Sequence, residues 1–235
     1  MPVAEPYRTV LLMDGAGEVP ENTNHSDEYT PRQQAVLESA LGLLVAGGEK
    51  ALTTAGVARA ASCSKESLYK WFGDREGLLA AMISYQASKV RTFTDDGAAM
   101  DAQRYRAYLL AFAKDLLNVL AGDVSLALNR LAIGQASQEG NSLAQLLIER
   151  GRKRIDQRAG ALLEAGKRRG LIHYDDRDDT YHVFYGLIVR DLHVRMLLGD
   201  AGARQPQRFD ELAEAAVTKF FALYAAREEE RVARL

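Results

Sequence analysis

The chain has 235 residues, of which 47% are hydrophobic and 26% are charged, and its formal net charge is −2. This composition is typical of a globular protein with a substantial core and excludes extensive disorder. The one cysteine, Cys63, excludes an intramolecular disulfide and an all-cysteine metal site. The sequence shows neither a signal peptide nor a run of about 18 apolar residues, which predicts a cytoplasmic protein without a membrane partner.

Residues 1–29 are predicted to form a flexible acidic arm, because glycine, proline and asparagine interrupt them and no apolar period is sustained. Residues 1–30 hold six acidic side chains and one basic side chain, whereas residues 31–75 hold six basic and four acidic ones. A locally basic face matters more for binding phosphate than the charge of the whole chain. Residues 31–75 are therefore the candidate for a nucleic-acid contact.

Helical order is predicted to begin after Thr30. Together with Pro31 and Gln33, this residue forms the pattern of a capping box that has proline in the first turn. Apolar residues then recur at helical spacing until Gly47-Gly48 ends the helix.

Three further capping residues divide the next segment into helices. The helices begin after Thr53, Ser64 and Asp74 and run to about residues 61, 72 and 93. Ser62 and Cys63 form a tight break between the first two. A long helix followed by two short helices across a tight turn is a helix-turn-helix arrangement, whose motif spans about residues 53–72.

Every periodic segment after residue 101 is predicted to be helical, and no strand-like alternation is present. One helical face runs over residues 105–116, and a long helix begins near Leu143 and ends at Gly170. The next helix is capped by Asp178 or Asp179 and ends at Gly199, and the last covers 209–223. The chain is therefore predicted to be all-α, with a DNA-binding domain at 30–75, a second helical domain at 76–227 and a charged tail at 228–235.

The helix that begins after Ser64 has the composition of a helix that reads DNA. Its first residues are short or charged, so that the backbone can approach the major groove while Lys65 and Ser67 reach base edges or phosphates. Tyr69 and Lys70 lie one turn later and suit phosphate contacts. From composition alone, a helical hairpin with a polar outer face remains the alternative.

The order of residues between 52 and 79 resembles the TetR (tetracycline-repressor) family of bacterial regulators, and the likeness covers residues 31–93. It rests on Leu52-Thr53-Thr54, Val57-Ala58, Ala60-Ala61, Ser64-Lys65, Ser67-Leu68-Tyr69, Phe72, Asp74-Arg75-Glu76 and Leu78-Leu79. The chain departs from the family at the turn, where Ser62-Cys63 replaces the usual Gly-Val. This departure predicts a positive φ angle at Ser62.

The resemblance implies a ligand-responsive, sequence-specific transcriptional regulator without enzymatic activity. It implies a homodimeric repressor that a small-molecule effector releases from double-stranded operator DNA, with a C-terminal domain that binds the effector and dimerises. The alternative is a small helical ligand-binding protein or enzyme that uses the helix-turn-helix only as a packing unit. The resemblance places these residues at DNA, with Arg75 on a phosphate: Thr54, Ser64, Lys65, Glu66, Ser67, Tyr69, Lys70 and Arg75.

Six side chains among the middle helices are candidates for lining an effector cavity, because cavities of this kind lie between the helices of a bundle. They are Tyr85, Tyr105, Tyr108, Phe112, Arg130 and Gln135. Aromatic residues at helical spacing are also typical of a core, and core packing remains the alternative.

The segment from Asp179 to Leu198 is predicted to be one strongly apolar helix that crosses its copy in a second subunit. Gly186 lies in its middle, where glycine costs about 1 kcal/mol relative to alanine, and the close approach of another backbone would explain why glycine is used there. That backbone belongs either to a second subunit or to another helix of the same chain. The predicted dimer interface consists of Ile155, Ala159, Leu162, Phe184, Gly186, Ile188 and Leu192.

The sequence predicts no catalytic site, cofactor or metal. The four histidines are scattered, and the acidic residues at 175–179 are interpreted as helix caps in preference to a cation loop. Eight basic residues lie between Arg150 and Arg169, Arg152 among them. They are interpreted as a solvated helix, with a second nucleic-acid surface as the alternative.

Overall fold

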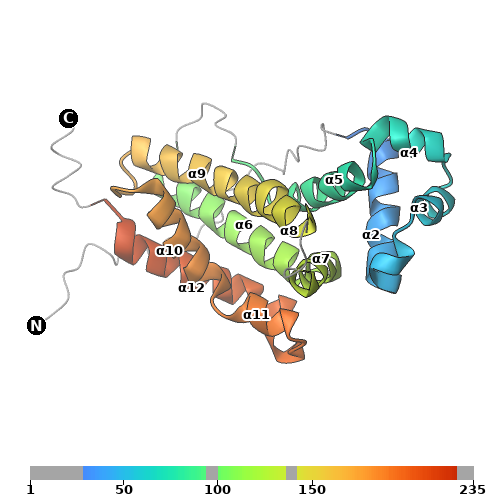
Figure 1. The fold of residues 1–235 in the computed structure, drawn as a ribbon. Helices are drawn as coiled ribbons and strands as arrows, with labels where there is room; N and C mark the ends of the chain where they lie inside the picture. Colours follow the sequence, from blue (N-terminus) through green and yellow to red (C-terminus); the bar gives the residue numbers. More distant parts are fainter. Residues whose placement is uncertain (1–28, 94–99, 136–141, 227–235) are drawn as a thin grey trace, which may run out of the picture.

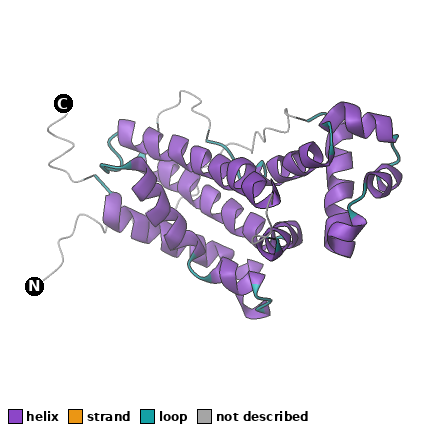
Figure 2. Ribbon diagram, in the orientation of Figure 1, coloured by secondary structure: helices purple, strands orange, loops and turns teal. Residues whose placement is uncertain are grey.

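The computed structural model describes residues 29–93, 100–135 and 142–226, and within these ranges it contains helices and no strand (Figure 2). One isolated antiparallel bridge joins Ile172 to Ala225. The all-α prediction is confirmed. The arm, apart from Tyr29, and the charged tail lie outside the described residues.

The N-terminal domain consists of α2 (Pro31–Ala51), α3 (Thr54–Ala60) and α4 (Lys65–Phe72), and α5 (Arg75–Ala87) follows it. Each of the four predicted capping side chains accepts a hydrogen bond from the backbone three residues later, so all four caps are confirmed. The capping box at Thr30 is complete. In α2, non-helical dihedrals at Gly48 (φ 63°) interrupt the helix where the sequence predicted its end.

These helices share one apolar core. Val36, Leu37 and Leu44 of α2 are buried against the short helices, which contribute Val57 and Leu68. Burial of a side chain of this size contributes roughly 1.5–3 kcal/mol. Leu68 and Phe72 of α4 are buried in this core and Trp71 packs against it, so the polar residues of α4 remain on the outside.

The turn between α3 and α4 has the strained backbone that the sequence predicted, with φ 49° at Ser62. Arg32, at the start of α2, holds this turn in place. Its Nη2 donates to the carbonyl oxygens of Ala61 at 2.9 Å and of Ser62 at 2.7 Å. A serine in the left-handed region costs roughly 1–2 kcal/mol, and the packing around the turn offsets that cost.

Replacement of Ser62 by glycine is expected to raise the free energy of unfolding by about 1 kcal/mol, because glycine adopts this φ without steric penalty. Denaturant titration measures the change. Ser39→Gly, in the right-handed interior of α2, is the matched control and is expected to lower stability by roughly 0.5–1 kcal/mol. A loss of stability in Ser62→Gly would contradict the assignment of strain to this residue.

The second domain is built around α6 (Ala102–Ala121), which lies between α9 (Lys153–Arg168) and a layer of α10 (Arg177–Val189) and α12 (Phe209–Tyr224) (Figure 1). Next to this core lie α7 (Asp123–Gly134), α8 (Ser142–Leu146) and α11 (Leu192–Leu197), and the short helices η4 (Ala201–Ala203) and η5 (Pro206–Arg208) precede α12. Among the described residues no single helix is long and apolar enough to cross a membrane, and α6 and α7 pass that test only as a pair bent by 61°.

Three predicted helix boundaries were wrong. The helix α5 ends at Ala87 instead of near Phe93, because the chain turns there and Arg158 donates to the carbonyl oxygens of Ala87 and Val90. The cap of α10 is Asp176, which accepts a hydrogen bond from the backbone of Asp179 at 2.8 Å. In addition, the predicted single helix at 179–198 is two helices.

The break between these two helices lies at Arg190. Its φ of 50° is incompatible with a right-handed helix, so α10 ends at Val189 and α11 begins at Leu192. The long helix predicted from Leu143 is continuous through α8 and α9, but Leu147–Arg152 form a π-helical segment, η3. Such a segment widens a helix locally and is common at functional sites.

Candidate nucleic-acid interface and central pocket

The outer face of α4 exposes the residues that the sequence proposed for DNA. Ser64, Lys65, Glu66, Tyr69 and Lys70 are exposed, and Thr54, Ser67 and Arg75 are exposed or half-buried. Tyr69 alone keeps 55% of its surface accessible, which is unusual for a large aromatic side chain without a partner. All eight side chains are thus on the surface, where a duplex could reach them.

Three of these residues surround one small hollow. Thr54 from α3, Tyr69 from α4 and Arg75 from α5 line it together with Asp74, the cap of α5. The N-terminus of a helix is a favourable place for an anion, because its backbone N–H groups and dipole point outward. The hollow therefore combines a guanidinium, a phenol and a helix N-terminus, three groups that can bind a phosphate.

The first turn of α4 is organised by its own polar side chains. Ser64 Oγ accepts a hydrogen bond from the Ser67 backbone at 3.0 Å and lies 3.1 Å from Ser67 Oγ. Backbone hydrogen bonding at the helix start, with a further bond from Ser64, lowers the pKa of Glu66 below its usual value. Glu66 is thus a carboxylate at neutral pH, which can accept a hydrogen bond from a base but is repelled by phosphate.

Glu49 is a functional candidate that sequence reasoning missed. Its Oε1 accepts from Arg75 Nη2 at 2.7 Å, and its Oε2 accepts from Gln135 Nε2 at 2.5 Å. This carboxylate therefore connects the residue proposed for phosphate to the end of α7 in the other domain. No local pattern marks such a residue, because its two partners are distant in sequence.

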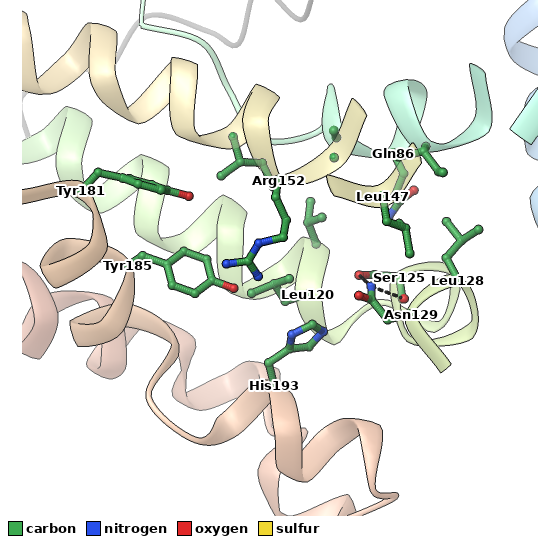
Figure 3. Close-up of a pocket in the computed structure, with 15 residues that line it drawn as sticks. Gln86, Leu120, Ser125, Leu128, Asn129, Leu147, Arg152, Tyr181, Tyr185 and His193 are labelled. Carbon is green, nitrogen blue, oxygen red and sulfur yellow. Dashed lines mark hydrogen bonds between the residues drawn. The ribbon is translucent and has the colours of Figure 1, made fainter. Parts of the chain in front are cut away.

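A pocket lies in the second domain between α5, α6, α7, η3, α9, α10 and α11, and it encloses about 650 Å³ including its open mouth (Figure 3). Its wall is largely apolar, with Ile83, Val119, Leu120, Leu128, Leu147 and Ile155. An apolar wall with a few polar groups is typical of a small-molecule site. The π-helical segment supplies Leu147, Gly151 and Arg152, so the widened helix forms one side of the pocket.

Two polar atoms in this pocket are buried without a hydrogen-bond partner, Gln86 Oε1 and His193 Nε2. Unpaired buried polar atoms are rare in folded proteins, because each costs roughly 1–3 kcal/mol. Burial, together with the charge of Arg152, lowers the pKa of His193, so its imidazole is neutral at neutral pH. A bound molecule could therefore supply the hydrogen-bond partner that each of these two atoms lacks.

None of the six side chains proposed for the effector cavity lines this pocket. Tyr105, Tyr108 and Phe112 are core residues with at most 7% of their surface exposed. Phe112 stacks on Phe184 at 6.0 Å between ring centroids, and Tyr108 meets Phe93 edge to face at 5.1 Å. The alternative of core packing is therefore the one the structure supports for the aromatic residues of α6.

The other three are held by partners elsewhere. The hydroxyl of Tyr85 donates to Glu38 Oε1 at 2.6 Å, and burial beside that carboxylate raises the pKa of Tyr85 to about 12. Arg130 donates to the carbonyl oxygens of Met196 and Leu197 at the end of α11, and Gln135 bonds to Glu49. These three polar groups connect helices to one another instead of facing the cavity.

The proposed dimer residues divide into two groups. Five of them are at most 8% exposed, because they pack inside their own subunit, and they are therefore unavailable to a partner: Ile155, Ala159, Leu162, Phe184 and Ile188. Gly186 is exposed, and a Cβ atom built on it would meet nothing within 4 Å. The alternative that Gly186 closely contacts another helix of the same chain is therefore wrong. Leu192, the seventh proposed residue, is half-buried.

An exposed helix-turn-helix joined to a helical domain that contains a pocket defines a DNA-binding transcriptional regulator. Residues 36–82 match the model for bacterial regulatory proteins of the tetR family, and residues 107–226 match the C-terminal domain of AefR-like transcriptional repressors. The chain belongs to the TetR family of transcriptional regulators.

Individual relatives agree with this assignment. A TetR transcriptional regulator from Agrobacterium tumefaciens is 58% identical, covers 88% of this chain and 100% of its own, and superposes with a TM-score of 0.74. A TetR-family regulator from Pseudomonas syringae pv. tomato, at 19% identity, shares the fold with a TM-score of 0.58 over 85% of this chain and 99% of its own. The uncharacterized HTH-type transcriptional regulator YvkB of Bacillus subtilis is 23% identical over 183 residues, which are 75% of this chain and 89% of that protein.

Proposed function

We propose that this regulator is a cytoplasmic, homodimeric repressor that leaves its operator when a small molecule occupies the central pocket. One observation carries the proposal: α5 belongs to both sites. Its first residue, Arg75, lines the hollow beside α4, and its last turns contribute Ile83, Gln86 and Ala87 to the pocket. A ligand that displaces the pocket end of α5 also displaces the end that adjoins the reading helix.

The surface of α4 supports a division of labour on DNA. Lys65 and Ser67, in its first turn, are placed for base edges, and Glu66 can accept from the amino group of cytosine. Tyr69, Lys70 and Arg75 are exposed and are proposed to contact DNA phosphates. Phosphate contacts fix the register of the protein on the duplex but do not distinguish base sequences. Two such heads must lie about 34–36 Å apart to meet successive major grooves.

Control by a ligand follows from that spacing. A shift of α5 in each subunit changes the separation of the two reading helices and therefore the affinity for the operator. The ligand achieves this only if it binds one separation more tightly than the other. The bond from Gln135 to Glu49, which also holds Arg75, supports a second connection between the domains.

Fluorescence anisotropy with the DNA upstream of its own gene tests the proposal. The purified protein is expected to bind one segment of that DNA with an affinity that falls as salt rises, and Lys65→Ala or Ser67→Ala is expected to change the preferred sequence. A DNA affinity that depends on neither salt concentration nor base sequence would favour the alternative, a helical binding protein that uses its helix-turn-helix only as a packing unit.

A further inference from the structure

We infer that the pocket takes an amphipathic monoanion, a molecule with an apolar body, one carboxylate or phenolate oxygen at one end and a hydrogen-bond donor at the other. The inference rests on the proposed function, because it names the chemical class of the effector. It is carried by the polar groups of the pocket and by their positions on two sides of an apolar wall.

The anionic end is assigned to Arg152, the last residue of the π-helical segment. Arg152 is an exposed residue whose guanidinium points into the pocket and lies 5.3 Å from the centroid of the Tyr185 ring (Figure 3). The aromatic ring holds the cation by a cation–π contact, which leaves the N–H groups of the guanidinium available to a ligand.

The carboxylates nearest to Arg152 in sequence are engaged elsewhere. Glu149 pairs with Lys153 at 2.6 Å, and Asp156 pairs with Arg177 at 3.2 Å. Across the described ranges, Arg152 forms no salt bridge with a carboxylate. The carboxylate or phenolate of a ligand could therefore pair with this guanidinium without breaking an existing salt bridge.

His193 adds a second donor at the same end. Its Nε2 is buried and unpartnered, and Figure 3 shows the ring beside the Arg152 guanidinium. A neutral imidazole that carries its proton on Nε2 donates to an oxygen without adding charge. One guanidinium and a neutral donor suit a single negative charge better than a dianion such as a phosphate monoester.

The opposite end is assigned to Gln86, which lies across the pocket beside Leu147 (Figure 3). The residue is 8% exposed and its Oε1 has no hydrogen-bond partner, so it can accept a bond from a ligand hydroxyl or N–H group. Asn129, nearby, is already engaged with the backbone oxygen of Ser125 at 2.8 Å. Between the two ends the walls are aliphatic, which the body of the ligand must match.

Isothermal titration of the full-length protein, without DNA, tests the inference with matched probes. Naphthalene carboxylate and decanoate are compared with naphthalene carboxamide and decanol, which separates an aromatic body from an alkyl one while keeping the charge as the variable. Each acid is expected to bind at least about tenfold more tightly than its neutral partner, because a charge-assisted pair contributes roughly 1.5–3 kcal/mol. A hydroxynaphthalene carboxylate, with the hydroxyl on the ring opposite the acid, is expected to bind more tightly again.

Three variants assign the effect to residues. Arg152→Gln is expected to abolish the preference for acids, and Gln86→Leu to abolish the preference for the hydroxylated acid. Arg150→Gln removes an exposed cation of the same π-helical segment that does not line the pocket, and it is expected to bind like the parent protein. Circular dichroism and the retained binding of neutral probes show that each variant is folded.

The inference is overturned if neutral probes bind as tightly as the acids, if Arg152→Gln keeps the preference, or if none of the probes binds at millimolar concentration. Its failure is distinct from failure of the proposed function. Release of the protein from DNA by a neutral compound would refute the monoanion and leave ligand control intact. Tight binding of an acid that leaves the DNA affinity unchanged would support the monoanion and refute ligand control.

Discussion

Replacement of Gly186 by leucine is expected to give a folded, helical monomer whose operator affinity is lower by roughly a hundredfold or more, because the two reading helices then no longer act as one bivalent unit. Glycine in the middle of a helix costs about 1 kcal/mol, and the structure offers no reason for it within the subunit, since a Cβ atom there has open space. The reason is expected in a second subunit, whose α10 crosses the same point along a two-fold axis.

Exposed apolar side chains support this surface. Leu223 of α12, which lies beside α10 in Figure 1, is 63% exposed, and Val194 and Leu198 near the end of α11 are 60% and 82% exposed. The buried residues of α10, such as Phe184 against Phe220 at 4.7 Å, hold the helix on its own subunit. We therefore expect a second subunit to contact the outer face of α10, with Gly186 at the centre of that contact.

Sedimentation velocity and anisotropy with operator DNA measure the two effects together. Gly134→Leu is the matched control, because Gly134 is another exposed helical glycine with open space around its Cβ position, and it lies on α7. That variant is expected to remain dimeric and to bind DNA normally. A Gly186→Leu protein that sediments as a full dimer would place the interface elsewhere.

The sequence predicted the local structure of the N-terminal domain closely, because caps and turns are short-range features. Thr30, Thr53, Ser64 and Asp74 each start a helix where a side-chain oxygen can reach a backbone N–H three residues on. Even the positive φ of Ser62 followed from the residue type expected in that turn. The sequence also predicted which face of α4 is exposed, because Leu68 and Phe72 mark the face that is buried.

The pocket could not be predicted in the same way, because it is assembled from seven helical segments. Gln86, Arg152 and His193 are far apart in sequence and meet only after the second domain has packed. The basic cluster that contains Arg152 gave no sign that the side chain of one of its members lines a pocket. The placement of that side chain depends on the π-helical segment, which side-chain periodicity does not reveal.

Five residues of the predicted dimer interface are buried inside their own subunit for a related reason. The apolar residues of α10 exceed a single stripe, which a partner subunit and a double layer within the subunit would explain equally well. The structure shows the second case: Phe184 lies against Phe112 of α6 and Phe220 of α12, and Ile188 is buried in the same core. Of the predicted interface residues in α10, Gly186 is the one exposed on the outer face of the helix.

Replacement of Lys70 by alanine is expected to weaken specific and random DNA alike, and to reduce the slope of log affinity against log salt by about one unit per subunit. Lys70 is exposed in the last turn of α4, one turn beyond Lys65 and Ser67, the residues proposed to contact bases. A lysine there neutralises a phosphate and releases a counterion without distinguishing sequences. Affinity at several salt concentrations, for operator and for random duplex, gives both slopes.

Arg150→Ala is the matched control, because it removes the same charge from an exposed position in the second domain. It is expected to leave both slopes unchanged, which separates a local phosphate contact from the effect of net charge. Loss of affinity for the operator alone would instead assign Lys70 to a base edge. If Lys65, Ser67 and Lys70 can each be replaced without any change in DNA affinity, α4 is not the helix that reads the operator, and the hollow around Arg75 must be reassigned with it.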